Sequence, residues 1–319
     1  MGSSSQLVPF PLLMNESYTA CTIPWRFPPD DPRILTATEL SWINLLHKTI
    51  PTYKKHAESD TSVPDAANKA EKFAQRFARI LEDFKKDPGS QGGPLDILLL
   101  CRLREQVLRE LGFRDIFKKI KDVENANAIA LFENVVRLND AIEDEGERLE
   151  NLVRGIFAGN IFDLGATQVI IFVDNSGADI ILGILPFARE LLRRGSQVIL
   201  AANDLPSIND VTYSELIEII SKLKDEDGSL MGVSTSNLLI ANSGNDLPVI
   251  DLKGVSQELA DLANDADFVV LEGMGRGIET NLYAQFKCDS LKIAMVKHLE
   301  VAEFLGSRLY DCVIKYDEV

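Results

Sequence analysis

The sequence predicts an α/β protein with a three-layer, mostly parallel, Rossmann-like sheet and an N-terminal all-helical domain. Up to about residue 165, apolar residues recur at helical spacing between breakers, whereas from Val169 onward short β-branched runs alternate with helix-like segments. A length of 319 residues is enough for two domains that each bury a core. We therefore expect a helical domain over residues 1–166 and an α/β domain over residues 167–319.

The N-terminal half is predicted to form a series of helices. In the first two, apolar residues recur three and four positions apart, with Pro51 interrupting the first helix. A loop rich in glycine then leads to Pro94, a residue type that favours the first turn of a helix. We expect helices over residues 36–58, 65–86 and 94–111, followed by a long helical stretch to residue 156.

Six short apolar runs in the C-terminal half are predicted to be strands. The first is apolar throughout, which is typical of a strand buried on both faces. Helix-like segments separate several of the runs, so the strands are expected to be mostly parallel. The expected strands are residues 169–173, 197–201, 238–241, 267–271, 291–296 and 312–315, with helices over residues 180–192, 213–224 and 256–264.

Composition and charge disfavour several classes of partner. The formal net charge of −16 argues against nucleic acid and anionic membranes, because both would be repelled at long range. No stretch approaches the ~20 apolar residues of a membrane span, and the N-terminus lacks a secretory signal pattern. The four cysteines are far apart and match neither a disulfide framework nor a zinc motif, so we expect a reducing, cytoplasmic setting.

Asp174 and Asn175 follow the first expected strand at its carboxyl end, where ligands bind in open α/β sheets. Adjacent carboxylate and amide oxygens suit a hard divalent cation. Gly177 lets backbone N–H groups come close to an anion, and Asp179 lies in the first turn of the following helix. The structural alternative is that Asp174 or Asn175 only caps that helix.

Asp210 follows the next strand and can reach the same edge of the sheet if the two strands are neighbours. A third oxygen ligand at this position would complete a site of the magnesium type, with water and substrate oxygens as the remaining ligands. The alternative is that Asn209 or Thr212 caps the next helix and that Asp210 is simply solvated.

Residues 272–276 place glycines at alternate positions after a strand and end with an arginine. Gly273 and Gly275 let the backbone come close to another group, and Arg276 supplies a planar cation for phosphate. Glu272, at the strand end, can orient water or a metal-bound group. The spacing is not that of a dinucleotide-binding motif, and the alternative is a glycine-rich turn without a ligand.

Two further positions offer contacts to an anion. Lys297 ends the fifth expected strand, so its ammonium group is expected at the carboxyl edge of the sheet, where it can meet phosphate. Ser243-Gly244, after the third strand, offers another turn that can contact an anion. We interpret His298 as a helix-start or surface residue and Trp42 as part of the core.

Together these segments resemble the metal-dependent damage-control phosphatases, and in particular the branch fused to eukaryotic pantothenate kinases. The motifs that carry the resemblance are DNSGAD at 174–179, IND at 208–210, EGMGR at 272–276, GNIFD at 159–163 and Lys297. Family members usually carry further residues between the GN element and the first strand. This chain enters the strand at Val169 with almost no linker, so either packing is tight there or residues after Gln168 are missing.

The resemblance implies a divalent cation, Mg²⁺, Mn²⁺, Co²⁺ or Ni²⁺, held by Asp174, Asn175 and Asp210. It also implies that substrate phosphate is bound by Lys297 and by the loop at 272–276. The expected catalytic residues are Asp174, Asp179 and Lys297, and the expected phosphate-binding residues are Asn160, Ser243, Glu272, Gly273, Gly275, Arg276 and Lys297.

We therefore predict a phosphatase that hydrolyses small phosphomonoesters in metabolite damage control, with 4′-phosphopantetheine or its oxidised forms as the expected substrate and a role in coenzyme A metabolism. The alternatives are a sugar-phosphate phosphatase, a carboxyl methyltransferase and a non-catalytic domain that binds phosphorylated metabolites. Metal-bound water is favoured over Asp174 as the attacking group, because haloacid-dehalogenase phosphatases need a second aspartate where this chain has Ser176. The expected partner is a small phosphorylated metabolite, without nucleic acid or membrane, and the choice between monomer and homo-oligomer is open.

Overall fold

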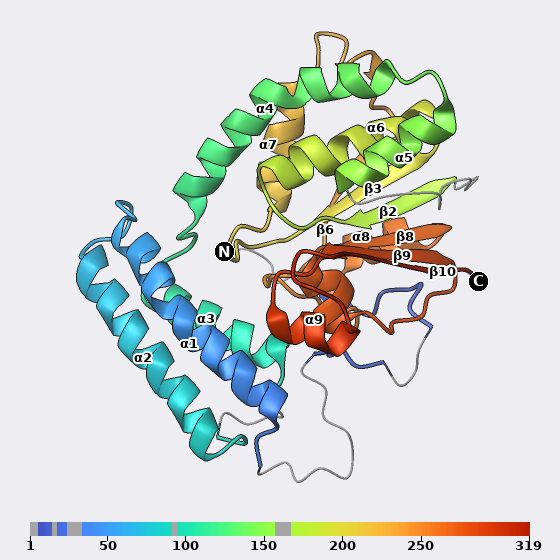
Figure 1. Ribbon diagram of the computed structural model, residues 1–319. Helices are drawn as coiled ribbons and strands as arrows, with labels where there is room; N and C mark the ends of the chain where they lie inside the picture. Colours follow the sequence, from blue (N-terminus) through green and yellow to red (C-terminus); the bar gives the residue numbers. More distant parts are fainter. Residues whose placement is uncertain (1–5, 15–17, 24–33, 91–94, 157–166) are drawn as a thin grey trace.

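The computed structural model describes residues 6–14, 18–23, 34–90, 95–156 and 167–319, with the side chains of 153–156 left undescribed (Figure 1). Its centre is a six-stranded sheet with the strand order β10-β9-β8-β2-β3-β6. The strands are β2 (Gln168–Phe172), β3 (Gln197–Ala202), β6 (Leu238–Asn242), β8 (Phe268–Glu272), β9 (Asp289–Met295) and β10 (Cys312–Asp317). All six expected strands are confirmed, and all neighbours are parallel except β9 and β10.

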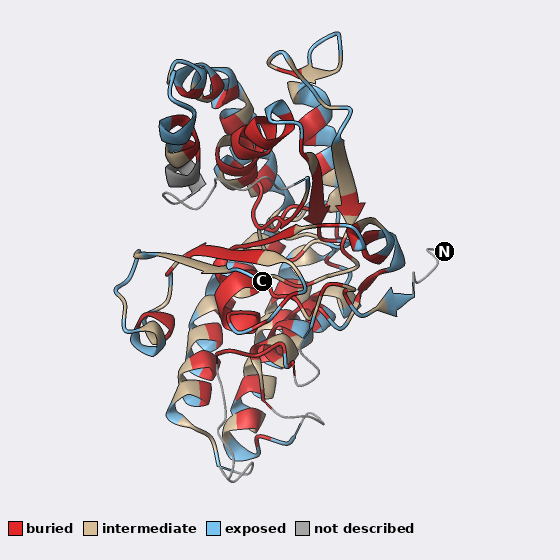
Figure 2. Cartoon of the chain, turned by 90° about the vertical axis from the view of Figure 1, so that its right-hand side faces the viewer, coloured by how far each residue is buried: buried red, intermediate tan, exposed pale blue. Residues whose placement is uncertain are grey.

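The central strand β2 is apolar because both of its faces are covered. Val169 and Ile171 point into one hydrophobic cluster, whereas Ile170 and Phe172 point into another on the opposite face. All four are 0% exposed, and Figure 2 shows the strands of the sheet as largely buried. An apolar run buried on both faces is what a parallel sheet between helical layers requires.

Helices cover the two faces unequally. The first cluster joins the sheet to α4 (Lys118–Asp140), α5 (Glu145–Ile156), α6 (Leu185–Arg193) and α7 (Tyr213–Leu223). The opposite face is covered by α8 (Gln257–Ala263) and by the N-terminal segment around Phe10 and Tyr18. That segment is tied to the sheet side by a short pairing of β1 (Leu7–Val8) with β7 (Val255–Ser256).

Three helices form a separate bundle, seen beside the sheet in Figure 1. They are α1 (Ala37–Glu58), α2 (Ala66–Lys86) and α3 (Ile97–Glu110). Their shared core includes Trp42, Phe73 and Phe77, and it continues into Met274 beyond β8 and Val301 of α9 (Leu299–Leu305). The helices expected before residue 156 are therefore divided, since α1–α3 form the bundle while α4 and α5 pack on the sheet.

Two local features differ from the sequence expectation. Pro51 lies inside α1 and does not end it, and the helix begins with a capping box between Thr36 and Glu39. The helix expected from residue 180 begins as a π-helical turn, Asp179–Ile184, because the N–H of Ile180 donates to the carbonyl of Asn175.

A second π-helical turn, Met274–Thr280, follows β8. Both β2 and β8 are therefore followed by a π-helical turn. The remaining regular structure is a small hairpin of β4 (Ser229–Leu230) and β5 (Val233–Ser234). Among the described residues, no helix is long and apolar enough to cross a membrane.

Candidate active site

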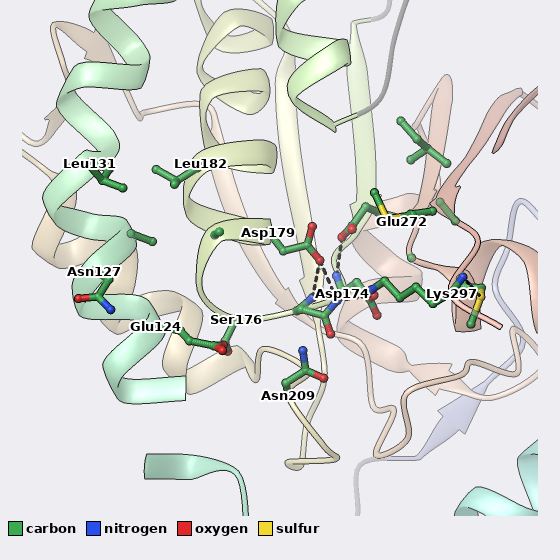
Figure 3. Close-up of a pocket in the computed structure, with 18 residues that line it drawn as sticks. Glu124, Asn127, Leu131, Asp174, Ser176, Asp179, Leu182, Asn209, Glu272 and Lys297 are labelled. Carbon is green, nitrogen blue, oxygen red and sulfur yellow. Dashed lines mark hydrogen bonds between the residues drawn. The ribbon is translucent and has the colours of Figure 1, made fainter. Parts of the chain in front are cut away.

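The expected site residues gather at the carboxyl edge of the sheet, where β2 has β3 on one side and β8 on the other. Phe172 of β2 pairs with Ala201 of β3 and with Leu271 of β8, so the three strands end side by side. Ligands bind at such switch points in open α/β sheets. Figure 3 shows Asp174, Glu272 and Lys297 converging there from the ends of β2, β8 and β9.

The loops after β2 and β3 are fastened to each other by backbone hydrogen bonds. The N–H of Ser176 donates to the carbonyl of Asn209 at 2.9 Å, and the N–H of Val211 donates to the carbonyl of Asp174 at 2.9 Å. Asn175 and Asp210 consequently form an isolated antiparallel bridge. The structure thus brings Asp174, Asn175 and Asp210 together, although they come from separate loops.

The structure decides which of the possible helix caps are formed. Thr212 caps α7 in a capping box with Glu215, as one alternative proposed for this segment. Asp210, by contrast, is 0% exposed and is not solvated. Neither Asp174 nor Asn175 caps the helix after β2, because the residue before the π-helical turn is Ala178, which makes no side-chain cap.

Arg276 is a brace between carboxylates in this arrangement. Its guanidinium donates to Asp174, to Asp210 Oδ1 at 2.6 Å and to Asn203 Oδ1 at 3.0 Å. The side chain is 1% exposed and lines neither of the two cavities described below. We expected Arg276 on the substrate phosphate, but here its donors are directed at Asp174, Asp210 and Asn203.

The buried acids at this edge are strongly perturbed. Burial raises the pKa of Asp174 to about 7 and the pKa of Asp210 to about 6, although Arg276 opposes both shifts. Burial and the charges of Asp179 and Asp174 raise the pKa of Glu272 well above its ordinary value. Several carboxylates in one water-poor place repel one another, and a bound cation would relieve that repulsion.

The donor set fits a hard divalent cation. One oxygen of Asp210, Oδ2, is buried and has no hydrogen-bond partner among the described residues. Carboxylate oxygens of Asp174, Asp179 and Glu272 lie within 4.8 Å of one another, and Asn175 adds an amide next to them. Such all-oxygen surroundings suit Mg²⁺ or Mn²⁺ in particular.

The loop at 272–276 supports Asp174 directly. Glu272 Oε2 accepts the backbone N–H of Asp174 at 2.7 Å. Gly273 has φ +99°, and a Cβ atom there would lie 2.3 Å from Asp174 Cγ. A Cβ on Gly275 would lie 2.2 Å from the carbonyl oxygen of Pro248. The alternating glycines therefore allow a close approach between protein groups, which explains a pattern that we interpreted as a contact to substrate.

Two cavities meet at the site. The first, of about 470 Å³, lies between the edge of the sheet and α4, and its lining includes Asp179, Glu272 and Glu124. The second, of about 230 Å³, lies on the side of α1 and α3. Asp174, Asn175, Asn209, Met274 and Lys297 line both cavities.

Lys297 is the expected phosphate ligand whose placement agrees best with that role. Its side chain is exposed, borders both cavities and extends toward Asp174 (Figure 3). Ser243 lines neither cavity, and its hydroxyl accepts the N–H of Asn245. Asn160 lies outside the described residues.

Several residues at the site were not identified from the sequence. Asn203 accepts from Arg276 and donates to the carbonyl of Leu247 at 3.0 Å, and its position directly after β3 was a usable signal. Trp42 and His298, which we interpreted as a core residue and a helix-start residue, both line the second cavity. His298 does precede α9 as expected, yet only the tertiary structure places it there.

Comparison with known proteins points to one family. The damage-control phosphatase ARMT1-like domain matches residues 45–168 and 165–313, two segments that meet at the junction before β2. Damage-control phosphatase At2g17340 of Arabidopsis thaliana is 65% identical over 365 aligned positions that cover all of both chains. This chain has 319 residues, so the alignment contains positions of the relative that have no counterpart here.

Other relatives are longer proteins. The 4′-phosphopantetheine phosphatase of Mus musculus is 31% identical over 86% of this chain, and pantothenate kinase 2 of Arabidopsis thaliana is 34% identical over 86%. These matches span 45% and 39% of the two relatives, less than half of each. A crystal structure of a DUF89 family protein from Pyrococcus horikoshii has the same fold, with a TM-score of 0.57 and 17% identity over 88% of this chain and 97% of that one.

Proposed function

The chain belongs to the damage-control phosphatases with an ARMT1-like domain, and from that membership we propose that it hydrolyses 4′-phosphopantetheine or an oxidised form of it. It is a phosphatase for small phosphorylated metabolites. The substrate choice is supported by the 4′-phosphopantetheine phosphatase of Mus musculus, which is 31% identical to this chain. The single observation that carries the proposed chemistry is the meeting of buried carboxylates with the exposed Lys297 where two cavities join.

The family is metal-dependent, and we propose Asp174, Asn175 and Asp210 as the residues that would hold the cation, from among Mg²⁺, Mn²⁺, Co²⁺ and Ni²⁺. Asn175 and Asp210 form the bridge between the two loops, and Asp174 belongs to a carboxylate cluster with Asp179 and Glu272. When bound, a divalent cation would polarise a phosphoryl oxygen and lower the pKa of a water molecule. The unpartnered Oδ2 of Asp210 supports this choice of ligands. Asp179 and Glu272, whose oxygens cluster with those of Asp174, would then orient the ligands.

Lys297 would bind the substrate phosphate, because it is an exposed cationic residue that lines both cavities. Asp179 is half-buried and borders the first cavity, where it can accept a proton from the attacking water. We propose Asp174 as a metal ligand and not as the nucleophile, because Ser176 stands where haloacid-dehalogenase phosphatases need a second aspartate. One oxygen of Asp174 accepts from Arg276 and the other accepts from Asn175 Nδ2 at 2.8 Å, and each keeps a lone pair for a cation.

We also propose a description of the sheet, a role for the helical part and a location for the protein. The strand order, with β2 between β3 and β8, supports a Rossmann-like, three-layer description of the sheet. The walls that α1 and α3 give to the second cavity support a cap role for the helical part before residue 166. A cytoplasmic, reducing location is supported by the four cysteines, which form no disulfide in the described parts of the chain.

The test is phosphate release by protein that has been stripped with a chelator and then given Mg²⁺, Mn²⁺, Co²⁺ or Ni²⁺ in turn. The substrates are 4′-phosphopantetheine, its sulfonate and a panel of sugar phosphates. Turnover that returns with metal and is fastest on the pantetheine esters supports the proposal. A preference for sugar phosphates would replace the substrate, and folded protein that releases no phosphate with any metal would replace the chemistry by metabolite binding.

A further inference from the structure

We infer that the second cavity is a subsite for the organic part of the phosphoester, and that it selects an uncharged, largely apolar arm carrying an amide or hydroxyl group. This inference rests on the proposed function, because an arm enters this cavity from a phosphate held at the shared wall. We assign recognition of the arm to three residues of the cavity lining: Trp42 of α1, Glu279 after β8 and His298 after β9.

The position of the cavity connects it to the reacting group. Asp174, Asp210 and Lys297 are among its lining residues, so a phosphate bound at Lys297 has the cavity directly beside it. The opposite wall comes from α1 and α3, which contribute Trp42 and Ile97 among others. With a volume of about 230 Å³, the cavity has room for a chain of several heavy atoms beyond the phosphate.

Most of the lining is apolar, which limits how many polar groups an arm can bury there. Leu46, Ile97, Val249 and Met274 present carbon and sulfur surfaces to the cavity. Arg104 also borders it, but its guanidinium is 2% exposed and is bound to Glu105 at 2.8 Å. A polyol would leave hydroxyl groups without partners on such a surface, and each unpaired polar group opposes binding.

Several buried polar atoms in the lining make no hydrogen bond to the part of the chain that the structure describes. Among the described residues, Trp42 Nε1 is buried without any hydrogen bond. Within this set, Glu279 Oε1 and His298 Nδ1 also make none, although the two atoms lie 3.6 Å apart. Trp42 is 1% exposed and Glu279 is 5% exposed, so water in bulk does not satisfy them. Asp210 Oδ2, which also borders the cavity, makes none either in the described chain. Buried polar groups in native proteins are nearly always hydrogen-bonded, so this group of atoms around one cavity indicates a ligand.

The chemistry of these atoms defines the arm. The indole N–H of Trp42 can only donate, so the arm must offer an acceptor such as an amide carbonyl. The carboxylate of Glu279 accepts, so the arm must also offer an N–H or O–H donor. Its negative charge, next to Asp174 and Asp210, repels an anionic arm. A secondary amide or a hydroxyl beside a carbonyl meets all three requirements.

The first cavity differs from the second in its polar groups. It is larger, it borders α4, and its acids are Glu124, Asp174, Asp179 and Glu272. Apart from Ser176, none of the buried atoms without a partner belongs to its lining within the described chain. With that exception, the buried polar atoms that an amide or hydroxyl group could satisfy therefore lie in the second cavity and not in the first.

The experiment compares an ester that has the arm with an ester that lacks it. The ratio of kcat/KM for 4′-phosphopantetheine to kcat/KM for p-nitrophenyl phosphate is measured in wild type, Trp42→Phe, Glu279→Leu and Glu279→Gln. We expect the ratio to fall about tenfold in Trp42→Phe and in Glu279→Leu, the usual effect of one lost hydrogen bond to a ligand. Glu279→Gln keeps an acceptor and should retain much of the ratio, which loss of folding or of packing alone would not produce.

Two further measurements make the outcome decisive. Glu124→Gln, in the first cavity, is the matched control, and a ratio that falls there but not in the Glu279 variants would overturn the inference. Calorimetric binding of pantetheine, which has the arm and no phosphate, tests the subsite without turnover. Wild type that binds pantetheine but hydrolyses no ester would refute the proposed function and leave the subsite standing. Equal binding by wild type, Trp42→Phe and Glu279→Leu would refute the subsite.

Discussion

Carboxylates at the two ends of the central strands differ in hydrogen bonding and in the direction of their pKa shifts. At the amino end, Asp267 accepts the N–H and hydroxyl of Thr167 at 2.8 and 2.6 Å and the N–H of Gln168 at 3.0 Å. Its pKa is lowered by these hydrogen bonds, despite some burial. At the carboxyl end, burial raises the pKa of Asp174 and Asp210, and one oxygen of Asp210 has no partner in the described chain. The same residue type is thus satisfied where it holds structure and unsatisfied where a ligand is expected.

The largest expected effect is at the unsatisfied end. Asp174→Ala removes a proposed metal ligand and should lower metal-dependent phosphatase kcat/KM by about 1000-fold or more. Circular dichroism and thermal unfolding check that the variant is folded. A folded variant with full activity would remove Asp174 from the site and with it the contrast between the two ends.

The next largest effect is expected on stability, from replacing Arg276, which binds both Asp174 and Asp210. Arg276→Met leaves Asp174 and Asp210 buried without their cation, and should lower the free energy of unfolding by about 3–5 kcal/mol in urea titrations. The control is Arg308→Met, because Arg308 is 88% exposed and pairs with Asp311 on the surface. We expect that control to change the unfolding free energy very little. Equal effects for the two variants would show that Arg276 does not hold the acids.

A smaller effect is expected from pH on metal-free protein. Asp174 and Asp210 have an ordinary pKa of 3.8 that is raised to about 7 and about 6, so they stabilise the fold most below about pH 4. That contribution is lost as the pH rises through the raised values. The melting temperature of chelated protein should therefore fall between about pH 4 and about pH 7, and a divalent cation should reverse the fall. A melting temperature that is indifferent to the cation across this range would contradict the proposed metal site.

The smallest effect is expected at the satisfied end. Asp267→Asn weakens the hydrogen bonds to Thr167 and Gln168 and should lower the free energy of unfolding by about 1 kcal/mol. Phosphatase kcat/KM should stay within about twofold of wild type, because surface substitutions away from a site have small effects. A large loss of activity would mean that both ends of the strands contribute to the chemistry.

Much of the fold could be predicted from sequence periodicity. The apolar runs identified all six strands to within a few residues, because strands buried on both faces carry a continuous apolar signal. Pairing between distant segments was harder to foresee. Nothing local indicates that α4 and α5 pack on the sheet while α1–α3 form a bundle, since all five have an amphipathic face.

The site could be predicted in part, because polar residues at the ends of parallel strands must meet at one edge. That rule located Asp174, Asp210, Glu272 and Lys297. It could not tell which donor faces which acceptor, so it gave no sign that Arg276 donates to Asp174, Asp210 and Asn203. The second cavity was missed because Trp42 lies far from the sheet residues in the sequence, and an aromatic residue at helical spacing gives the same signal whether it lines a core or a cavity.

The bridge between the loops after β2 and β3 limits how these loops can open. Because Ser176 and Val211 donate to the opposite loop at 2.9 Å, the amide protons of these residues should exchange with solvent about as slowly as those of the strands they follow. The ligand loops then open only when the sheet itself opens, so they form one cooperative unit with it.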